Sequence, residues 1–422
     1  MMLGLYRAAT QGLAPLVDLY LAQRRRRGKE DGARFPERRG IAAHPRPAGP
    51  LIWIHGASVG EALSALPLVE RLAARAAILV TTGTVTSAAL LAERLPANAF
   101  HQYVPVDRLP WVRRFLDYWR PDLALWLESE FWPNLMLETA ARRIPMALIN
   151  GRVSDRSLAS WRRMPGAVRT LLGCFAWALG QSEEDARRLA LLGARHTGCV
   201  GNLKYAALPL PVDESGLARL QAEIGGRPLW LAASTHAGEE ALAARVQARL
   251  KAEIPGLLTL VVPRHPARGP AIAQELAASG MVVARRGADQ PIAPDTDLYL
   301  ADTMGELGLF YRLAPLVLIG KTLTAAGGQN PLEAARLGCA LLWGPRMDNF
   351  KTIAARLEEA GAAQAVADEN DLVVKLRRLL ADAPERAKMG AIGIGIARAE
   401  ADVLDRLIER LAPDLARLDA RP

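Results

Sequence analysis

The chain has 422 residues, which is more than one hydrophobic core usually organises, so two domains are expected. Half of the residues are hydrophobic and the glycine and proline contents are moderate, which excludes a largely disordered chain. The three cysteines lie far apart and form no C-x-x-C pair, which argues against a disulfide framework or a thiolate metal site and fits a reducing cytosol.

The net charge of +9 is concentrated at the N-terminus, where residues 1–50 hold ten Lys or Arg and four Asp or Glu. Residues 1–22 are apolar but contain Arg7 and Asp18, and the basic run Arg24–Arg27 follows. A spanning helix needs about 20 clean apolar residues, and a signal peptide needs an unbroken apolar core. We therefore expect residues 1–40 to be an amphipathic segment lying on an anionic membrane surface; a solvated helix with a charged tail is the alternative.

Residues 41–205 alternate short apolar runs with helical segments, which is typical of a buried parallel sheet. Strands are expected at 51–55, 78–82, 123–127 and 146–149, and helices near 59–74, 86–94, 109–118 and 133–143. In residues 206–228 the alternating pattern stops and proline and glycine become frequent. We interpret this stretch as an interdomain linker.

Residues 229–422 repeat the alternating pattern and predict a second domain. Strands are expected at 229–233, 257–262, 298–300, 316–319 and 340–343, with a long helical region near 384–411. The predicted fold class is α/β, with two doubly wound Rossmann-like domains that face each other across a cleft. In such sheets ligands bind at the carboxyl ends of the strands.

Glu61 is the first candidate for chemistry, because the strand at 51–55 runs directly into H-G-A-S-V-G-E. This places Glu61 at a strand-to-helix turn, where a carboxylate can act as a general base. Ser58 and Glu61 also have the spacing of a capping box, in which the glutamate only satisfies a backbone N–H group. From the spacing alone the two interpretations are equally good.

Glu128 and Glu130 form a second acidic candidate, directly after the strand at 123–127 and next to Phe131 and Trp132. Two acids at a strand end beside aromatic rings suggest contact with a sugar. A solvated loop explains the pattern equally well.

Two glycine-bearing loops in the second domain precede helices, at 302–306 and 327–333. Glycine lets a ligand approach the backbone, and free N–H groups at a helix start favour an anion, so the pair predicts a phosphate site. Glu306 and Glu333 could accept hydrogen bonds from a nucleotide's sugar or base. The alternative is that the loops only turn the chain and that both glutamates are ordinary first-turn acids.

Polar residues also follow the first two strands of the second domain. The fork of Arg264 suits a phosphate, and its position after a buried strand favours a ligand role. Neither His236 nor His265 has a carboxylate or cysteine at ligand spacing, so no metal site is expected. Asp295-Thr296-Asp297 precedes its strand, which favours a polar turn over a metal-binding D-x-D. Neither G-x-G-x-x-G nor a P-loop sequence is present.

The chain resembles the 3-deoxy-D-manno-octulosonic acid (Kdo) transferases of lipopolysaccharide synthesis, which have the two-domain GT-B glycosyltransferase fold. The resemblance runs from the basic N-terminal segment to about residue 350. In order, its motifs are H-G-A-S-V-G-E, P-V-D, E-S-E-F-W-P-N, N-G-R-V-S-D-R-S, Q-S-E-E-D, G-N-L-K, S-T-H-A-G-E-E, V-P-R-H-P-x-R, D-T-M-G-E-L and G-G-Q-N-P-L-E.

The resemblance implies an inverting transfer of Kdo from CMP-Kdo to a lipid A precursor, with Glu61 as the base. It implies no cofactor, and it places the protein on the cytoplasmic face of the inner membrane, attached through its N-terminus. The implied acceptor or sugar residues are Ser58, Gly60, Glu128, Glu130 and Arg152. The implied nucleotide residues are Ser234, Thr235, Arg264, His265, Met304, Gly305, Glu306, Gly328, Asn330 and Glu333.

The chain departs from the family pattern at two places. The family usually has histidine at the position of Gln329, and Gly-Gly-Ser or Gly-Gly-Thr at the position of Gly320-Lys321-Thr322. Two alternatives stay open: another GT-B enzyme that uses a UDP-sugar, as a transferase or an epimerase, and a membrane-peripheral nucleotide-binding protein without transfer activity. Nucleic acid is not expected as a partner, because basic residues interleaved with aromatic ones do not recur.

Overall fold

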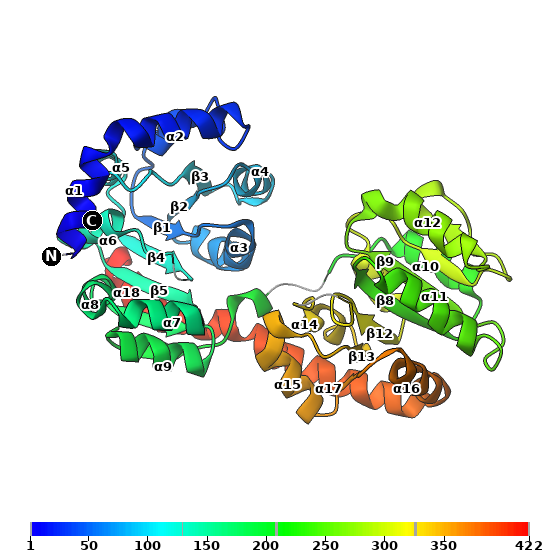
Figure 1. Ribbon diagram of the computed structural model, residues 1–422. Helices are drawn as coiled ribbons and strands as arrows, with labels where there is room; N and C mark the ends of the chain where they lie inside the picture. The colour runs from blue at the N-terminus through cyan, green and yellow to red at the C-terminus, as the bar shows by residue number, and fades with distance from the viewer. Residues whose placement is uncertain (1, 129, 207–209, 325–326, 421–422) are drawn as a thin grey trace. The chain divides into compact units, whose positions relative to one another are not determined.

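The computed structural model describes residues 2–128, 130–206, 210–324 and 327–420, and it divides into two compact units. The first unit comprises Met1–Ala207 together with Glu400–Pro422, and the second comprises Leu208–Ala399. Each unit contains a seven-stranded sheet with helices around it (Figure 1). All the strand pairs are parallel, as the buried apolar runs predict.

The sheet of the first unit has the strand order β3-β2-β1-β4-β5-β6-β7. Its strands are β1 (Leu51–His55), β2 (Ala77–Thr82), β3 (Ala99–Tyr103), β4 (Leu123–Leu127), β5 (Met146–Gly151), β6 (Trp177–Gly180) and β7 (Thr197–Cys199). The helices between them are α3 (Val59–Ala73), α4 (Val85–Arg94), α5 (Leu109–Trp119), α6 (Pro133–Ala141), α7 (Asp155–Arg162), α8 (Pro165–Leu172) and α9 (Glu183–Leu192). The strand order reverses between β1 and β4.

Strand β1 shows why the sheet forms, because its alternate residues serve two different cores. Ile52 and Ile54 belong to the core on one face, and Leu51 and Trp53 belong to the core on the other. All four side chains are fully buried. An apolar run without polar alternation is therefore what a strand covered by helices on both faces requires.

The N-terminal segment forms two helices, α1 (Met2–Gly12) and α2 (Ala14–Arg26), followed by the 3-10 helix Phe35–Arg39. Pro15 lies in the first turn of α2, where its missing N–H costs nothing. Among the described residues, none of the helices combines the length and the apolar character that crossing a bilayer requires.

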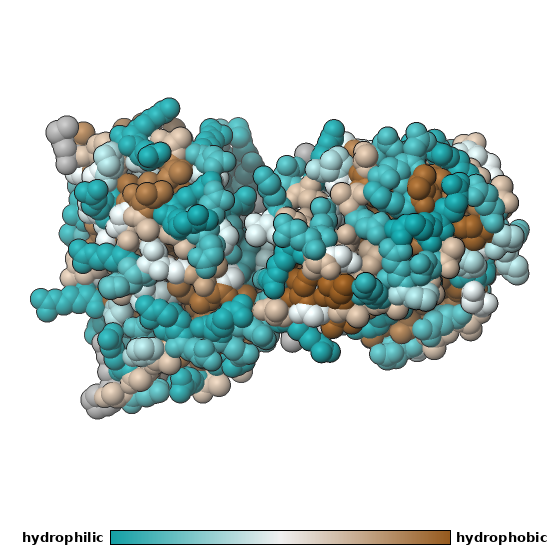
Figure 2. All heavy atoms as spheres, turned by 90° about the horizontal axis from the view of Figure 1, so that it is seen from below, coloured by the Kyte–Doolittle hydropathy of each residue, from teal (hydrophilic) through white to brown (hydrophobic). Residues whose placement is uncertain are grey.

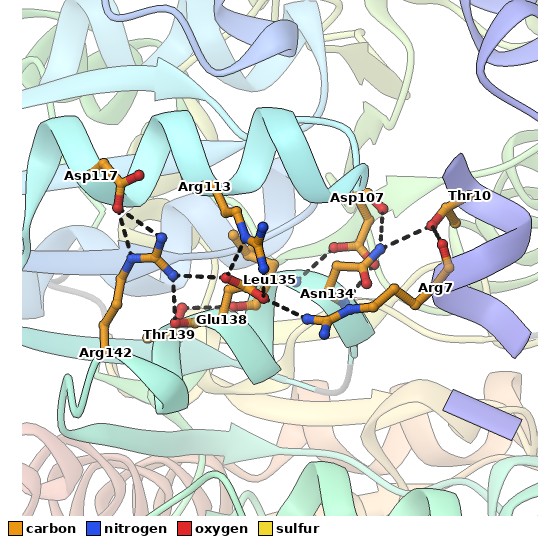
Figure 3. Close-up of polar contacts among 10 residues, drawn as sticks. All are labelled: Arg7, Thr10, Asp107, Arg113, Asp117, Asn134, Leu135, Glu138, Thr139 and Arg142. Atoms are coloured by element: carbon orange, nitrogen blue, oxygen red, sulfur yellow. Dashed lines mark hydrogen bonds and ion pairs between the residues drawn. The ribbon is translucent and has the colours of Figure 1, made fainter. Parts of the chain in front are cut away.

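Polar contacts fix α1 against α5 and α6 (Figure 3). Arg7 forms an ion pair with the buried Glu138 at 2.5 Å, and Arg113 and Arg142 contact the same carboxylate at 3.0 and 2.9 Å. Burial raises the pKa of Glu138, but hydrogen bonds from Arg113 and Arg142 outweigh it, so that the pKa is lowered. Thr10 accepts a hydrogen bond from the Asn134 amide at 3.1 Å. The helix therefore docks through Arg7 and Thr10 together with Leu3, which packs against the core.

The sheet of the second unit has the order β10-β11-β9-β8-β12-β13-β14 and reverses between β8 and β12. Its strands are β8 (Leu229–Thr235), β9 (Leu258–Pro263), β10 (Val283–Arg285), β11 (Leu298–Leu300), β12 (Leu316–Ile319), β13 (Ala340–Trp343) and β14 (Ala363–Ala365). The helices are α10 (Glu214–Ile224), α11 (Glu239–Leu250), α12 (Gly269–Ala278), α13 (Leu307–Leu313), α14 (Pro331–Ala335), α15 (Lys351–Glu359), α16 (Glu369–Ala381) and α17 (Ala383–Ala401).

The structure differs from the expected domain boundaries in two places. Residues 214–224, assigned to the linker, form α10 within the second unit, where the helix buries Leu220 and Ile224. Residues 207–209 of that linker lie outside the described part of the chain. The last helix, α18 (Val403–Asp419), was placed in the second domain but belongs to the first unit, because its apolar stripe completes a core there. Trp177 also donates to Asp414 at 3.0 Å.

The surface carries mainly hydrophilic side chains on the face seen in Figure 2, where hydrophobic side chains gather in limited groups. Elsewhere one group is notable because it lies on a short segment of chain. Large hydrophobic side chains of α1 and α2 and the residue between them are exposed, namely Met2, Leu5, Leu13, Leu16, Leu19 and Tyr20. Leu3 of α1 and Leu21 of α2 are covered by the domain, whereas these six apolar side chains remain exposed.

Candidate active site

Glu61 lies in the first turn of α3, immediately beyond the carboxyl end of β1. Its carboxylate accepts the Ala57 N–H at 2.7 Å and the Ser58 hydroxyl at 2.8 Å, and its own N–H donates to the Ser58 oxygen at 3.3 Å. The capping interaction considered from the sequence is therefore formed, with Ala57 instead of Ser58 as the backbone donor. Each carboxylate oxygen keeps a lone pair that can accept a proton.

The surroundings of Glu61 favour its protonated form. The side chain is only 7% exposed, and this burial raises the pKa of Glu61 above the ordinary value. Hydrogen bonds from Ala57 and Ser58 oppose the shift, while the negative charges of Glu128 and Glu130 add to it. A carboxylate whose pKa is moved towards neutrality is suited to taking and returning a proton.

Glu128 follows β4 and is held in an unusual backbone conformation, with φ of 53°. Its carboxylate forms a 2.7 Å ion pair with Lys204. Glu130 is exposed, and partial desolvation raises the pKa of its carboxyl group. Ser129, between the two glutamates, lies outside the described residues. A left-handed non-glycine residue at a strand end is the kind of strain that functional sites retain.

The first sheet brings Glu61 and Glu128 to the same place. They follow β1 and β4, the two neighbouring strands between which the strand order reverses. This switch point is where ligands bind in open α/β sheets. Ser58 and Gly60 are exposed beside Glu61, and Arg152 is exposed after β5, the next strand along. The predicted acceptor residues therefore lie along one edge of this sheet.

Sequence reasoning did not single out Lys204 and Asn150, which belong to the same edge. Asn150 has φ of 55° and accepts the Leu203 N–H at 3.0 Å, which fixes the turn that carries Lys204. Lys204 was visible only as part of G-N-L-K, because its partner Glu128 lies 76 residues earlier in the chain. An asparagine directly after a buried strand was the available signal for Asn150.

Ser234 and Thr235 end β8 at the switch point of the second sheet. Ser234 has φ of 55°, and Gly320 after β12 is so close that a Cβ there would stand 2.5 Å from the Ser234 carbonyl oxygen. Thr235 is buried and donates to Glu240 at 3.0 Å, so its hydroxyl holds the fold.

Arg264 and Glu333 come from different loops and interact electrostatically. Arg264 follows β9 and is exposed, while Glu333 is in the first turn of α14. Burial raises the pKa of Glu333, and the Asn330 amide at 3.4 Å and the charge of Arg264 oppose the shift. Asn330 also caps α14 by accepting the Leu332 N–H at 3.1 Å. Two predicted nucleotide residues, Arg264 and Asn330, thus act on the carboxylate of a third, Glu333.

The remaining nucleotide candidates are placed as follows. His265 packs edge-on against His236, with ring centroids 5.8 Å apart. Gly328 has φ of 69°, and a Cβ there would meet the Met347 sulfur at 2.6 Å, so both the backbone conformation and the available space favour glycine.

In the loop at Met304 and Gly305, the neighbouring Glu306 is already paired with an arginine. Met304 is 75% exposed and Gly305 has φ of 81°. Glu306 is engaged by Arg286, whose Nε donates at 2.6 Å, and this hydrogen bond lowers the pKa of Glu306. No motif or strand end marks Arg286, so sequence reasoning missed it.

The part of the chain that the structure describes contains no cluster of three or more His, Cys, Asp or Glu side chains arranged to hold a metal ion. Asp297 of the D-x-D sequence accepts the Val282 N–H at 3.0 Å and pairs with Lys251 at 3.2 Å. It therefore has a structural role in the turn before β11.

The fold and these sheet edges define a class of protein, the two-domain α/β proteins with a GT-B type of fold. Among solved structures the chain is similar to a UDP-N-acetylglucosamine 2-epimerase, with TM-score 0.60, 15% identity, and coverage of 90% of this chain and 99% of that one. A second epimerase, from Neisseria meningitidis, gives TM-score 0.57 at 13% identity and covers 86% of this chain and 100% of its own. At these identities the likeness establishes the fold alone, and it confirms the prediction of two doubly wound α/β domains.

Sequence comparison identifies the family. The family model described as 3-deoxy-D-manno-octulosonic-acid transferase matches residues 33–207. A 3-deoxy-D-manno-octulosonic acid transferase of Rickettsia bellii is 36% identical over 361 residues, covering 84% of this chain and 85% of that protein. The corresponding protein of Bordetella pertussis is 33% identical and covers 97% of this chain and 98% of its own. The chain belongs to the 3-deoxy-D-manno-octulosonic acid transferase family, as its motifs predict.

Proposed function

We propose that this protein transfers Kdo from CMP-Kdo to a lipid A precursor, with inversion at the anomeric carbon and with Glu61 as the general base. Family membership supports the transferred sugar. The single observation that carries the mechanism is the position of the Glu61 carboxylate, which is buried, raised in pKa and located beside Glu128 at the switch point of the first sheet.

The proposed step moves one proton and exchanges one bond. Glu61 takes the proton of an acceptor hydroxyl as that oxygen forms its bond to the anomeric carbon. The bond from the anomeric carbon to the CMP phosphate oxygen breaks, and CMP leaves with the electron pair. Lys204 holds the Glu128 carboxylate at 2.7 Å, which limits the negative charge that Glu61 experiences when it is ionised.

Arg264 is the proposed electrostatic partner of the departing CMP. It is exposed at the carboxyl end of β9, and a guanidinium can offer two parallel N–H donors to a phosphate. The positive charge of Arg264 can stabilise departing CMP, so the proposed reaction needs no cofactor or metal ion. Transfer that persists in the presence of a chelator supports this part of the proposal, and a strict need for a divalent ion contradicts it.

The N-terminal helices are proposed to lie on the cytoplasmic face of the inner membrane, where the lipid acceptor is found. Their exposed apolar side chains suit the acyl boundary of a bilayer. A cavity of about 550 Å³ beside them is lined by Asp18, Ala22, Arg25, Arg26, Phe35 and Arg39. Arg39 pairs with Asp18 at 2.8 Å in this cavity, and the exposed Arg25 and Arg26 fit the phosphate of an anionic headgroup.

Nucleotide selectivity tests the donor assignment and separates it from a UDP-sugar enzyme. Thermal unfolding of the full chain is followed with CMP, UDP or no nucleotide at equal concentrations. A ligand that binds only the folded state raises the midpoint. We expect CMP to stabilise the protein more than UDP, and the reverse order would contradict the assignment.

A further inference from the structure

Lys321 occupies the switch point of the second sheet, next to the end of β12. This strand pairs with β8 on one side and β13 on the other, and β8 ends in Ser234 and Thr235. Lys321 has φ of 62°, a conformation that glycine adopts at no cost and lysine adopts only when its surroundings impose it. Because glycine would suit this backbone better, we infer that the lysine side chain has a function here.

The surroundings that impose this conformation are well defined. The buried Glu239 accepts the Lys321 N–H at 2.7 Å, and its other oxygen accepts the N–H groups of Thr322 and Leu323 at 3.0 and 3.2 Å. The Lys321 carbonyl accepts the Gly328 N–H at 2.9 Å. These backbone bonds tie the turn after β12 to the second glycine loop. They fix the base of the Lys321 side chain and leave its ammonium group unused.

The ammonium group lies next to the second glycine loop and close enough to His236 to act on it. Its Nζ lies 3.5 Å from the position that a Cβ on Gly327 would occupy. It acts on His236, whose pKa is lowered first by burial and then by the positive charge of Lys321. The His236 ring also has Gln329 at 3.4 Å and packs on His265. Among the described residues the Lys321 ammonium forms no salt bridge.

We propose that Lys321 binds an anionic oxygen group of the sugar nucleotide, the phosphate of CMP or the carboxylate of Kdo. This inference rests on the proposed CMP-Kdo function and adds a donor-binding residue to it. A cation without a salt bridge at a switch point, next to a glycine loop and near the His236 ring, is complementary to such a group. The contribution is a point charge, which differs from the two-pronged contact available to Arg264.

The test compares Lys321→Gly, Lys321→Met and Lys321→Arg with the wild type. Lys321→Gly removes the ammonium group and suits the left-handed backbone, and thermal unfolding of each variant verifies that it is folded at the assay temperature. Lys251→Met is the control, because it removes a lysine that pairs with Asp297 in the turn before β11. Dissociation constants of CMP and cytidine and the KM for CMP-Kdo are measured for each protein.

We expect Lys321→Gly and Lys321→Met to lose about ten-fold or more in binding of the charged ligands, as for loss of a hydrogen bond to a charged group. Weaker CMP binding with unchanged cytidine binding identifies the phosphate. Unchanged CMP binding with a raised KM for CMP-Kdo identifies the sugar carboxylate. If the Lys321→Gly and Lys321→Met variants match the wild type for all three ligands, the Lys321 proposal alone is overturned. If the wild-type protein does not bind CMP, both the donor assignment and the Lys321 proposal are overturned.

Discussion

The Ser58 oxygen accepts the Glu61 N–H at 3.3 Å and its hydroxyl donates back to the Glu61 carboxylate at 2.8 Å. This reciprocal pair starts α3 and at the same time fixes the rotamer of the proposed base. Capping and catalysis were alternatives from the sequence alone, but the geometry makes them compatible. A base whose orientation is held by the helix cap needs no reorganisation when the acceptor arrives.

The raised pKa of Glu61 predicts how transfer depends on pH. Only the ionised carboxylate can take a proton, so kcat/KM should fall on the acid side through the raised pKa of Glu61 instead of the ordinary value of 4.5. Glu128→Gln removes a negative charge and leaves Lys204 unpaired, and both changes favour ionised Glu61. We expect the acid limb of the pH profile to move to lower pH in this variant. An acid limb that does not move would show that ionisation of Glu61 does not set it.

The same shift predicts a stability difference. Because the folded state favours protonated Glu61, the contribution of this group to stability is complete below pH 4.5 and is lost as pH rises through the folded pKa. Glu61→Gln, which cannot ionise, should therefore gain stability relative to the wild type between acidic and neutral pH. Urea unfolding of both proteins at several pH values measures this trend, and a constant difference would contradict it.

Arg264 and Glu333 are predicted to act on the donor alone. Arg264→Lys and Glu333→Gln should each weaken CMP and raise the KM for CMP-Kdo, because both positions lie around the proposed nucleotide site. The KM for the lipid acceptor should not change. Arg245→Lys, on the exposed surface of α11, is the control for the arginine. A variant that changes only the KM for the lipid acceptor would assign the substituted residue to acceptor binding instead of donor binding.

Glu239 is predicted to be a structural anchor of the second unit. It is 2% exposed and accepts backbone N–H groups from His236, Lys321, Thr322 and Leu323. Leaving a buried donor unpaired costs about 1 to 3 kcal/mol, so Glu239→Ala should reduce the unfolding free energy by about 3 kcal/mol or more. Glu359→Ala, on the exposed end of α15, should change it by about 0.5 kcal/mol at most. Chemical denaturation distinguishes these outcomes.

Membrane binding is predicted to depend on three arginines of the N-terminal segment. Arg24 is engaged by Glu30 at 2.6 Å, whereas Arg25, Arg26 and Arg27 are exposed. Each basic residue near an anionic surface is worth about 1 kcal/mol, and salt screens this within roughly 8 Å at physiological ionic strength. Changing these three to Gln should reduce co-sedimentation with vesicles containing phosphatidylglycerol.

A control with the same loss of charge is available in the second unit. Arg245, Arg249 and Arg377 are also exposed and can be changed together to Gln. We expect this triple variant to sediment with vesicles like the wild type. Equal loss of binding in both triple variants would show that overall charge, and not the N-terminal segment, directs the protein to the membrane.

The central strands except β6 (Trp177–Gly180) were predicted from the sequence, and the edge strands were not. Trp53 and its neighbours in β1 form an unbroken apolar run because helices cover both faces of the sheet. Strands β3, β7, β10 and β14 lie at the sheet edges, where half-exposed and polar residues are tolerated. His101 and Gln102 interrupt the pattern in β3, and β14 has only the residues Ala-Gln-Ala. Short mixed segments of this kind carry little periodicity.

The site residues could be predicted where a motif stands at a strand end, but their partners could not. Glu61 and Glu128 follow buried strands and are found next to each other across the switch point. Lys204 and Arg286 were missed because their partners are distant in the sequence. Lys204 lies 76 residues from Glu128, and Arg286 lies 20 residues from Glu306. The position of α18 in the first unit has the same cause, since nothing local indicates which core its apolar stripe completes.

The most direct test is mass spectrometry of the lipid product formed from CMP-Kdo and a tetraacylated lipid A precursor. The wild-type protein should release CMP and add Kdo to the lipid. Glu61→Gln should bind CMP as the wild type does and lose transfer by about 10² to 10⁴, as expected for a general base. The matched control is Glu70→Gln, an exposed change on the same helix, which should remain active. A Glu61→Gln variant that transfers Kdo at a near-normal rate would contradict the account.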